Sequence, residues 1–348
     1  MTSRQWISTR SVALFFYLKG ELFMLSFEAF MDLIREKLQS YYGDECTVEY
    51  NTVTKNNGQV WHGISIRRKD TSCAPNIYMD DAYEEYKEGK SIEKITTELI
   101  CLRDKCKDEV EFNADLFGDY EWVRERLGIK LVSRFKNSRL LPEVPHKDFS
   151  DMAVLFNVTI DDDTIGKGTI LIHNEHMQMW NVSVDRLFED AIASMMRSDP
   201  PYMADMVDVL IEMFESKEGA CFGDYAECLR QLKEQLKYAG ENGCYMYVLT
   251  NQSKINGASV IVYPGMLADI AKKVGGDYYL LPSSIHEVII VPVDRDEARG
   301  MELSMLVRDI NKEKLSPDET LTDHAYRYHR ATNWLEPVYE NAVRECAS

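Results

Sequence analysis

A short polar cluster separates two apolar runs in the C-terminal part of the sequence. The string YYLLPSSIHEVIIVPVD at residues 278–294 contains Ser283, Ser284, His286 and Glu287 within five positions. These residue types could serve a hydrolase or a transferase, or they could form a tight turn between two buried strands. Side chains alternate along a strand, so His286 and Glu287 cannot both face one site if the strand already includes them.

A turn explains the serines without any chemistry. Pro282 presets its own φ angle, and serine hydroxyls bond nearby backbone amides, as is usual in turns. The strands predicted at 278–281 and 288–293 would then form a hairpin with this loop at its tip. His286 is the better site candidate, because a histidine that enters an apolar strand needs a hydrogen-bond partner or a function. We therefore predict a candidate binding loop, with the turn as its alternative, made of Ser283, Ser284, His286, Glu287 and Asn251.

Two histidines at the end of a predicted strand could supply part of a metal site. His173 and His176 are separated by an asparagine and a glutamate. A strand end does not guarantee that they converge, and a third ligand such as His146 or Asp151 would have to come from elsewhere. We therefore expect no metal ion. His173 and His176 remain weak candidate ligands, and the alternative is that they are polar residues of a loop between a strand and a helix.

Cys221 lies in the string GACFG, where the flanking glycines would expose a thiolate. Catalysis would require a base such as His286 beside it, and the alternative is an idle or buried thiol. The sequence contains no GxxxxGK[ST], GxGxxG, HExxH or GxSxG motif, which excludes the easily recognised NTPases, dinucleotide enzymes, zincins and α/β-hydrolases. We expect no cofactor.

The composition restricts the class of partner. The 348 residues carry a formal net charge of −18, which repels nucleic acids and anionic membrane surfaces. We therefore expect no nucleic acid and no membrane partner, whereas a protein with a basic surface would fit. Eight scattered cysteines without a secretory signal indicate reduced thiols and a cytoplasmic location.

The first residues differ from the rest of the chain. Their apolar run at 12–18 is too short to span a bilayer, and no small-residue cleavage site follows it. The codons of Lys-Gly-Glu at 19–21 can read AAAGGAGAA, a bacterial ribosome-binding site, and Met24 follows a few bases downstream. We expect translation to begin at Met24, which makes residues 1–23 a non-native leader.

The first elements follow from local patterns. Residues 25–43 carry one apolar helical face that ends at Gly43. Segments 47–55 and 59–68 alternate around Asn57-Gly58, which favours a type I′ hairpin turn. A third strand at 76–79 and an acidic helical region at 80–111, capped by Ser91, complete a small α-β-hairpin-α unit.

A larger mixed α+β domain is predicted to follow, with a boundary within 111–128. The fold class is α+β, with domains at 24–115 and 116–348 and a helical insertion at 183–215. We predict strands at 129–135, 152–160, 168–173, 245–250, 259–263, 278–281 and 288–293. We predict helices at 183–196, 202–215, 224–238 and 266–274, and a final helix from the capping box at Ser316 to about His329.

Four strings in this order resemble a bacterial family known only as domain of unknown function 5688, from anaerobic gut bacteria. They are LPEVPHKDFSDMAVLFNV, NEHMQMWNVSVDRLFEDA, YVLTNQSKINGASVI and DYYLLPSSIHEVIIVP. The resemblance runs from about Met24 to the last predicted helix and implies no reaction, cofactor or catalytic residue. We expect a binding or regulatory module for a protein partner. The alternative is a hydrolase or transferase that uses the loop at 283–287 with His173, His176 or Cys221.

Overall fold

The structure is a computed structural model. It divides the chain into two compact units, which are described separately below. Unit 1 comprises Met1–Lys55, Val60–Asn113 and Asp161–Lys167, and unit 2 comprises Asn56–Gln59, Ala114–Ile160 and Gly168–Ser348. The residues that the structure describes are 24–69, 76–105, 114–162, 166–215, 225–231, 233–234, 246–293 and 299–339.

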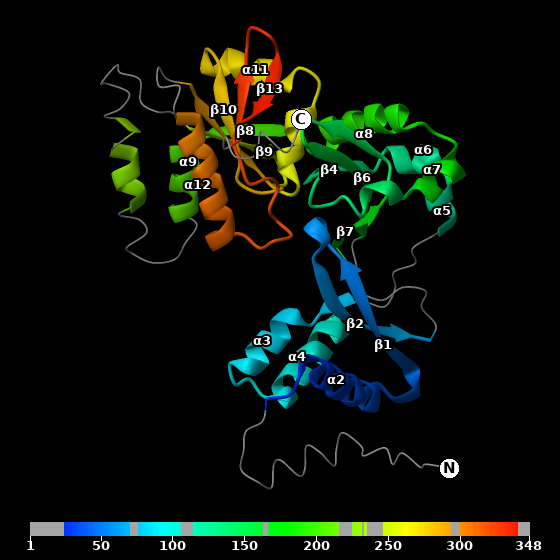
Figure 1. The fold of residues 1–348 in the computed structure, drawn as a ribbon. Coiled ribbons are helices and arrows are strands. Elements are labelled where there is room, and N and C mark those ends of the chain that lie inside the picture. The colour runs from blue at the N-terminus through cyan, green and yellow to red at the C-terminus, as the bar shows by residue number, and fades with distance from the viewer. Residues whose placement is uncertain are drawn as a thin grey trace, which may run out of the picture. The chain divides into compact units, whose positions relative to one another are not determined.

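Unit 1 is a three-stranded antiparallel sheet covered by helices (Figure 1). Ser26 caps the first helix by accepting a hydrogen bond from Ala29 N, and the helix ends at Gly43, whose φ is 58°. Ser91 caps the last helix in the same way, through Lys94 N. The elements are α2 (Phe27–Tyr42), β1 (Cys46–Thr54), β2 (Val60–Arg68), β3 (Asn76–Tyr78), α3 (Asp80–Lys87) and α4 (Ile92–Lys105).

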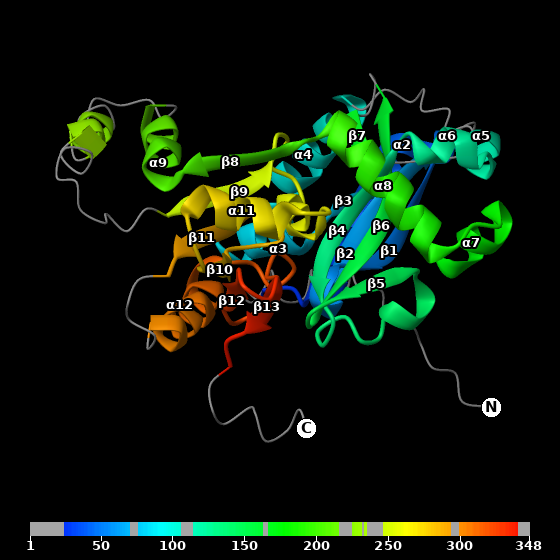
Figure 2. The same cartoon turned by 90° about the horizontal axis from the view of Figure 1, so that it is seen from above.

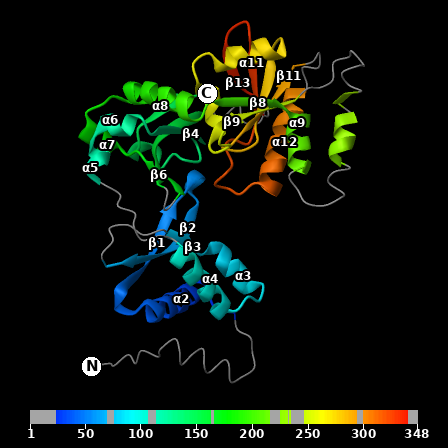
Figure 3. The same cartoon turned by 180° about the vertical axis from the view of Figure 1, so that it is seen from behind.

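The core of unit 1 lies between the helices and one side of the sheet (Figure 3). Apolar side chains recur at helical spacing on α2 and α4 and at alternate positions on β1 and β2, so both faces can bury them. The cluster includes Phe30, Ile34, Leu38, Val48, Ile64, Ile66, Ile95 and Leu99. The predicted α-β-hairpin-α arrangement of this unit is confirmed.

The turn after β1 has the backbone angles predicted for Asn-Gly. The φ angles of Asn57 and Gly58 are 59° and 69°, and Gln59 N donates to Asn56 O at 3.3 Å. The last paired residues are Thr54 and Val60, so the loop is longer than the two-residue connection of a tight hairpin.

Unit 2 contains two antiparallel sheets (Figure 2). The first sheet contains β4 (Leu127–Ser133), β5 (His146–Phe149), β6 (Met152–Asp162) and β7 (Gly166–Leu171). In this sheet β6 lies between β4 and β5 and also pairs with β7. The second sheet has the order β13 (Trp334–Pro337), β12 (Tyr326–His329), β10 (Tyr278–Pro282), β11 (Val288–Pro292), β9 (Tyr247–Asn251) and β8 (Pro201–Asp205).

Helices flank these sheets (Figure 2). They are α5 (Ala114–Gly118), α6 (Tyr120–Arg124), α7 (Asn174–Trp180), α8 (Val184–Ser198), α9 (Met206–Glu215), α11 (Met266–Val274) and α12 (Arg299–Lys314). One apolar core joins the two sheets, with members such as Phe156, Leu187, Val260, Tyr278 and Tyr328. A smaller cluster packs Val307 of α12 against the second sheet. Among the described residues, none of the helices combines the length and the apolar composition that a membrane span requires.

Most of the predicted elements of unit 2 are present, but three assignments were wrong. Residues 202–205 belong to the edge strand β8, because this segment pairs with β9, and only 206–215 are helical. Residues 257–262 form a 3-10 helix (η4, Gly257–Val262), not a strand; a short, fully buried apolar run carries no periodicity that distinguishes the two. The predicted helix 224–238 lies partly outside the described residues.

The third error is the final helix. Ser316-Pro317 fits a β-turn as well as a capping box, and Glu319 N donates back to Ser316 O at 3.0 Å. Residues 326–329 are strand β12. The helix before it, α12, was missed because its inward face carries Gly300, Ser304 and Asn311, whereas several of its apolar side chains are exposed.

Candidate functional site

A cavity of about 760 Å³ in unit 2 gathers titratable and aromatic side chains. One wall is the turn that follows β4, and the opposite wall is the segment that precedes β12. Its lining comprises Ser133, Arg134, Phe135, Lys136, Ser138, Leu141, Pro142, His146, Asp151, Thr322, Asp323, His324 and Tyr339. A cleft of this size with a few convergent polar groups is the usual form of a ligand site.

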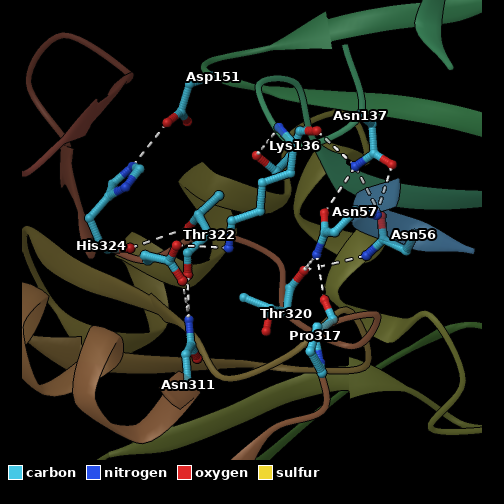
Figure 4. A network of polar contacts seen from close by, with 12 residues as sticks. Asn56, Asn57, Lys136, Asn137, Asp151, Asn311, Pro317, Thr320, Thr322 and His324 are labelled. Carbon is cyan, nitrogen blue, oxygen red and sulfur yellow. Dashed lines mark hydrogen bonds and ion pairs between the residues drawn. The ribbon is translucent and has the colours of Figure 1, made fainter. Parts of the chain in front are cut away.

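Asp151 is the centre of the polar cluster. Its Oδ1 accepts from the Tyr326 hydroxyl at 2.5 Å and its Oδ2 from the Tyr339 hydroxyl at 3.1 Å. His324 Nε2 lies 3.0 Å from Oδ2 (Figure 4), an ion-pair contact whose angles are not those of an ideal hydrogen bond. The imidazole packs between the rings of Tyr326 and Tyr339. Its orientation is therefore fixed on three sides.

The protonation of this cluster follows from its contacts. Burial alone would raise the pKa of Asp151, but the close contact with His324 and the hydrogen bonds from the two tyrosine hydroxyls outweigh it and lower the pKa below 3.8. Burial and the neighbouring Asp151 charge raise the pKa of Tyr339 to about 12. At neutral pH the carboxylate is ionised and the phenol is a hydrogen-bond donor.

A Lys–Asp pair forms another part of the wall. Lys136 Nζ lies 2.7 Å from Asp323 Oδ2, and Asn311 Nδ2 donates to Asp323 Oδ1 at 2.9 Å (Figure 4). Burial would raise the pKa of Asp323, but these two donors lower it. The pair is held in place from α12 and from the turn after β4.

The turn that carries Phe135 and Lys136 is anchored by a buried asparagine. Asn137 is 3% exposed, and its Nδ2 donates to Asn56 Oδ1, Asn57 Oδ1 and Ser133 O at 2.9–3.1 Å (Figure 4). Asn57 N donates to Asn137 Oδ1 at 3.0 Å. Every polar atom of the Asn137 side chain is thus satisfied, which fixes the turn beside the cavity.

In the predicted binding loop, Ser284 is buried and bonded to the local backbone as in a turn, whereas His286 is partly exposed. Ser284 is buried, and its Oγ accepts from His286 N at 3.0 Å, whereas Ser283 Oγ reaches Glu287 Oε1 only at 3.5 Å. The His286 side chain is 34% exposed and lies 3.9 Å from Glu319 Oε1.

The loop at 283–287 contacts the loop at 250–258. His286 Nδ1 accepts from Asn256 N at 3.1 Å, and Thr250 Oγ1 donates to His286 O at 2.7 Å. Asn251 is fully buried, and its Nδ2 donates to Ile255 O, so it faces its own loop. Two of the four strings that carry the resemblance, YVLTNQSKINGASVI and DYYLLPSSIHEVIIVP, therefore contact each other in the fold.

The two candidate metal ligands lie elsewhere. His173 caps α7, and His176 Nδ1 accepts from His173 N at 3.1 Å. The His176 ring packs against Phe117 and Trp180, and burial followed by the charge of His173 lowers its pKa. No group of three His, Cys, Asp or Glu side chains that could hold a metal ion occurs among the described residues. Cys221 lies outside the described residues.

The pair of Asp151 and His324 was not identified from the sequence as a site. The sequence suggests Asp151 only as a third metal ligand, and the helix that it predicts through His324 is absent, because His324 lies just before strand β12. Its neighbour Tyr326 is a strand residue that pairs with Leu280 of β10. A strand assignment at 326–329 would have provided the missing signal, because it places Tyr326 and Tyr328 on one buried face.

The contact between the loops at 250–258 and 283–287 can be tested with Gly257→Ala. The added Cβ would meet Thr250 Oγ1 and would lie 2.5 Å from His286 O and 2.7 Å from Asn251 N. Two of these are backbone atoms, so we expect a loss of about 2–3 kcal/mol in the free energy of unfolding, measured by urea denaturation. Gly276→Ala, with no atom within 4 Å of its Cβ, should change it by less than about 0.5 kcal/mol. Equal midpoints for the two variants would contradict the contact.

The Asp151 cluster predicts a pH-dependent stability. Because its folded-state pKa is lowered below 3.8, the ionised carboxylate stabilises the fold above that pH, and this contribution is lost as the pH falls through the folded pKa. Asp151→Asn should cost about 2 kcal/mol near neutral pH. The difference from wild type should shrink as the pH falls from about 5 to below the folded pKa of Asp151.

Asp148→Asn provides the matched control for Asp151. Asp148 is exposed, and its ion pair among the described residues is with Arg134, at 3.1 Å, so its loss should cost less than about 1 kcal/mol. Denaturation curves at several pH values would measure both variants. A constant difference between Asp151→Asn and wild type over this pH range would exclude the proposed linkage.

Comparison with known proteins gives one match. No curated protein and no solved structure matches the chain. A family model described as "Family of unknown function (DUF5688)" matches residues 27–330. The match covers most of the 348 residues and includes most of each unit. The chain therefore belongs to the family of unknown function DUF5688.

Proposed function

We propose that this protein is a binding module for a protein partner, and that the 760 Å³ cavity receives an apolar side chain of that partner. The observation that carries the proposal is Phe135, which lines the cavity and is 88% exposed. Burial of a phenylalanine side chain is worth about 1.5–3 kcal/mol. A partner that covers Phe135 would gain this free energy.

The anchoring of the turn supports this proposal. Asn137, two residues after Phe135, is bonded at every side-chain polar atom. A preorganised aromatic side chain loses little conformational entropy on binding, and such residues often dominate the affinity of an interface. An exposed phenylalanine on a fixed turn is therefore better suited to recognition than one on a loose loop.

The charge of the chain indicates which partners would approach. A net charge of −18 attracts a basic surface over distances of the order of the Debye length, about 8–10 Å, and raises the association rate. We propose a basic surface around the inserted side chain of the partner. Cys101 and Cys228 form no disulfide among the described residues, which agrees with a reducing, cytoplasmic compartment.

The alternative of a hydrolase or transferase has less support. Within the described residues, the contacts of the His286 imidazole involve Asn256 and Glu319. Those of the His176 side chain involve His173, Phe117 and Trp180. The two imidazoles thus have separate surroundings and share no contact that could transfer a proton between them.

Peptide selection would test the binding proposal. A random peptide library displayed on phage, selected on the wild-type protein, should enrich peptides with an aromatic or large aliphatic residue flanked by Lys or Arg. Phe135→Ala should weaken the binding of these peptides by about tenfold or more, measured by fluorescence polarisation, because it removes the aromatic contact. Raised salt should weaken binding as well.

Trp334→Ala is the matched control. Trp334 is an aromatic residue of the same unit, 61% exposed on β13 and absent from the lining of the cavity. Its removal should change peptide affinity by less than about twofold. The proposal would be wrong if no peptide family were enriched, or if the selected peptides bound the Phe135→Ala and wild-type proteins equally.

A further inference from the structure

We propose that a second, smaller cavity of unit 2 binds a phosphate group. This cavity measures about 360 Å³ and shares Lys136 and Asp323 with the larger one. It is lined by Asn57, Gln59, Lys136, Arg308, Asn311, Lys312, Leu315, Pro317, Thr320 and Asp323. The inference does not depend on the proposed protein partner, because the ligand is of a different chemical class and the residue that tests it, Lys312, lines only the smaller cavity.

The charge of this lining is opposite to that of the chain. Three cations, Lys136, Arg308 and Lys312, and one carboxylate, Asp323, leave a formal charge of +2, whereas the whole chain carries −18. A local concentration of positive charge in a concave surface attracts compact anions, since the field is focused there. The charge of a phosphate monoester, about −1.5 to −2 at neutral pH, matches this value.

The hydrogen-bonding groups also fit an oxyanion. Asn57 Nδ2 already donates to Pro317 O and Thr320 O, and Asn311 Nδ2 donates to Thr322 O and Asp323 Oδ1. The side chains of Gln59 and Lys312, in contrast, have no partner among the described residues. An ammonium group, a guanidinium and an amide NH₂ provide only donors to a ligand whose oxygens are all acceptors.

The helix dipole does not account for these cations. Lys312 lies in the last turn of α12, where a positive charge offsets the partial negative charge of the helix C-terminus. Lys314 in the same turn provides that effect as well. Arg308 lies outside the last turn, and Lys136 comes from the turn after β4, yet both face the same cavity. Lys136 pairs with Asp323, but three cations from two separate segments still exceed the one carboxylate of the lining, and an anion would balance this excess.

Inorganic phosphate is the probe for this proposal. Isothermal titration calorimetry of the full chain at constant ionic strength should show saturable binding with one site per molecule. Lys312→Gln should weaken it by about tenfold, because it removes one charge-assisted hydrogen bond. Acetate at the same concentrations should bind at least about tenfold more weakly than phosphate, because it carries a single charge.

Lys314→Gln is the matched control, since it removes the same charge from the same turn of α12 but does not line the cavity. It should change phosphate affinity by less than about twofold. Lys312 is exposed, so its variant should keep the wild-type melting temperature. The proposal fails if phosphate shows no saturable binding, if both lysine variants weaken it equally, or if acetate binds as tightly as phosphate.

Discussion

The larger cavity of unit 2 depends on the ionised carboxylate of Asp151. This residue lies just before β6 in the first sheet, and its three partners, His324, Tyr326 and Tyr339, belong to segments around the second sheet. A half-buried carboxylate is costly unless polar groups surround it, and here two tyrosine hydroxyls donate hydrogen bonds to it while the His324 imidazole lies beside it. The same contacts fix the opposite walls of the cavity, so one ionised group determines both local stability and the shape of the site.

Helix α12 extends this polar arrangement. Ser304 Oγ donates to Val338 O at 2.7 Å and accepts from Ala325 N at 3.0 Å, and Asn311 Nδ2 donates to Thr322 O. The helix thus holds the chain on both sides of His324 through hydrogen bonds, with Val307 as its main apolar contact in the core. A polar inner face gives directional contacts, which set the path of the segment at 322–325 more narrowly than apolar packing would.

The fold was predictable where the deciding interactions are local. In unit 1, the caps at Ser26 and Ser91 and the Asn57-Gly58 turn act within a few residues, so the pattern of the sequence identifies them. In unit 2, β8 is a strand because of its pairing with β9, more than forty residues later. Such pairing overrides the local preference of a segment.

The site was less predictable than the fold. Residue types identified His286 as a candidate, but they did not reveal its contact with Asn256. Asp151 and Tyr326 are 175 positions apart, and neither has a spacing that indicates chemistry. Phe135 and Lys312 are ordinary residues in the sequence, and their exposure beside cavities is visible only in three dimensions.

The pairing order of the second sheet has a consequence for how the chain folds during synthesis. Strand β10 is central and pairs with β12, and Leu335 of β13 belongs to the main core. The apolar face of β10 therefore stays incompletely covered until residues beyond 335 have left the ribosome. Unit 1, whose hairpin strands adjoin in the sequence, can form earlier. A ribosome that pauses before β12 would hold a nascent chain with an open sheet edge, the kind of surface that chaperones protect.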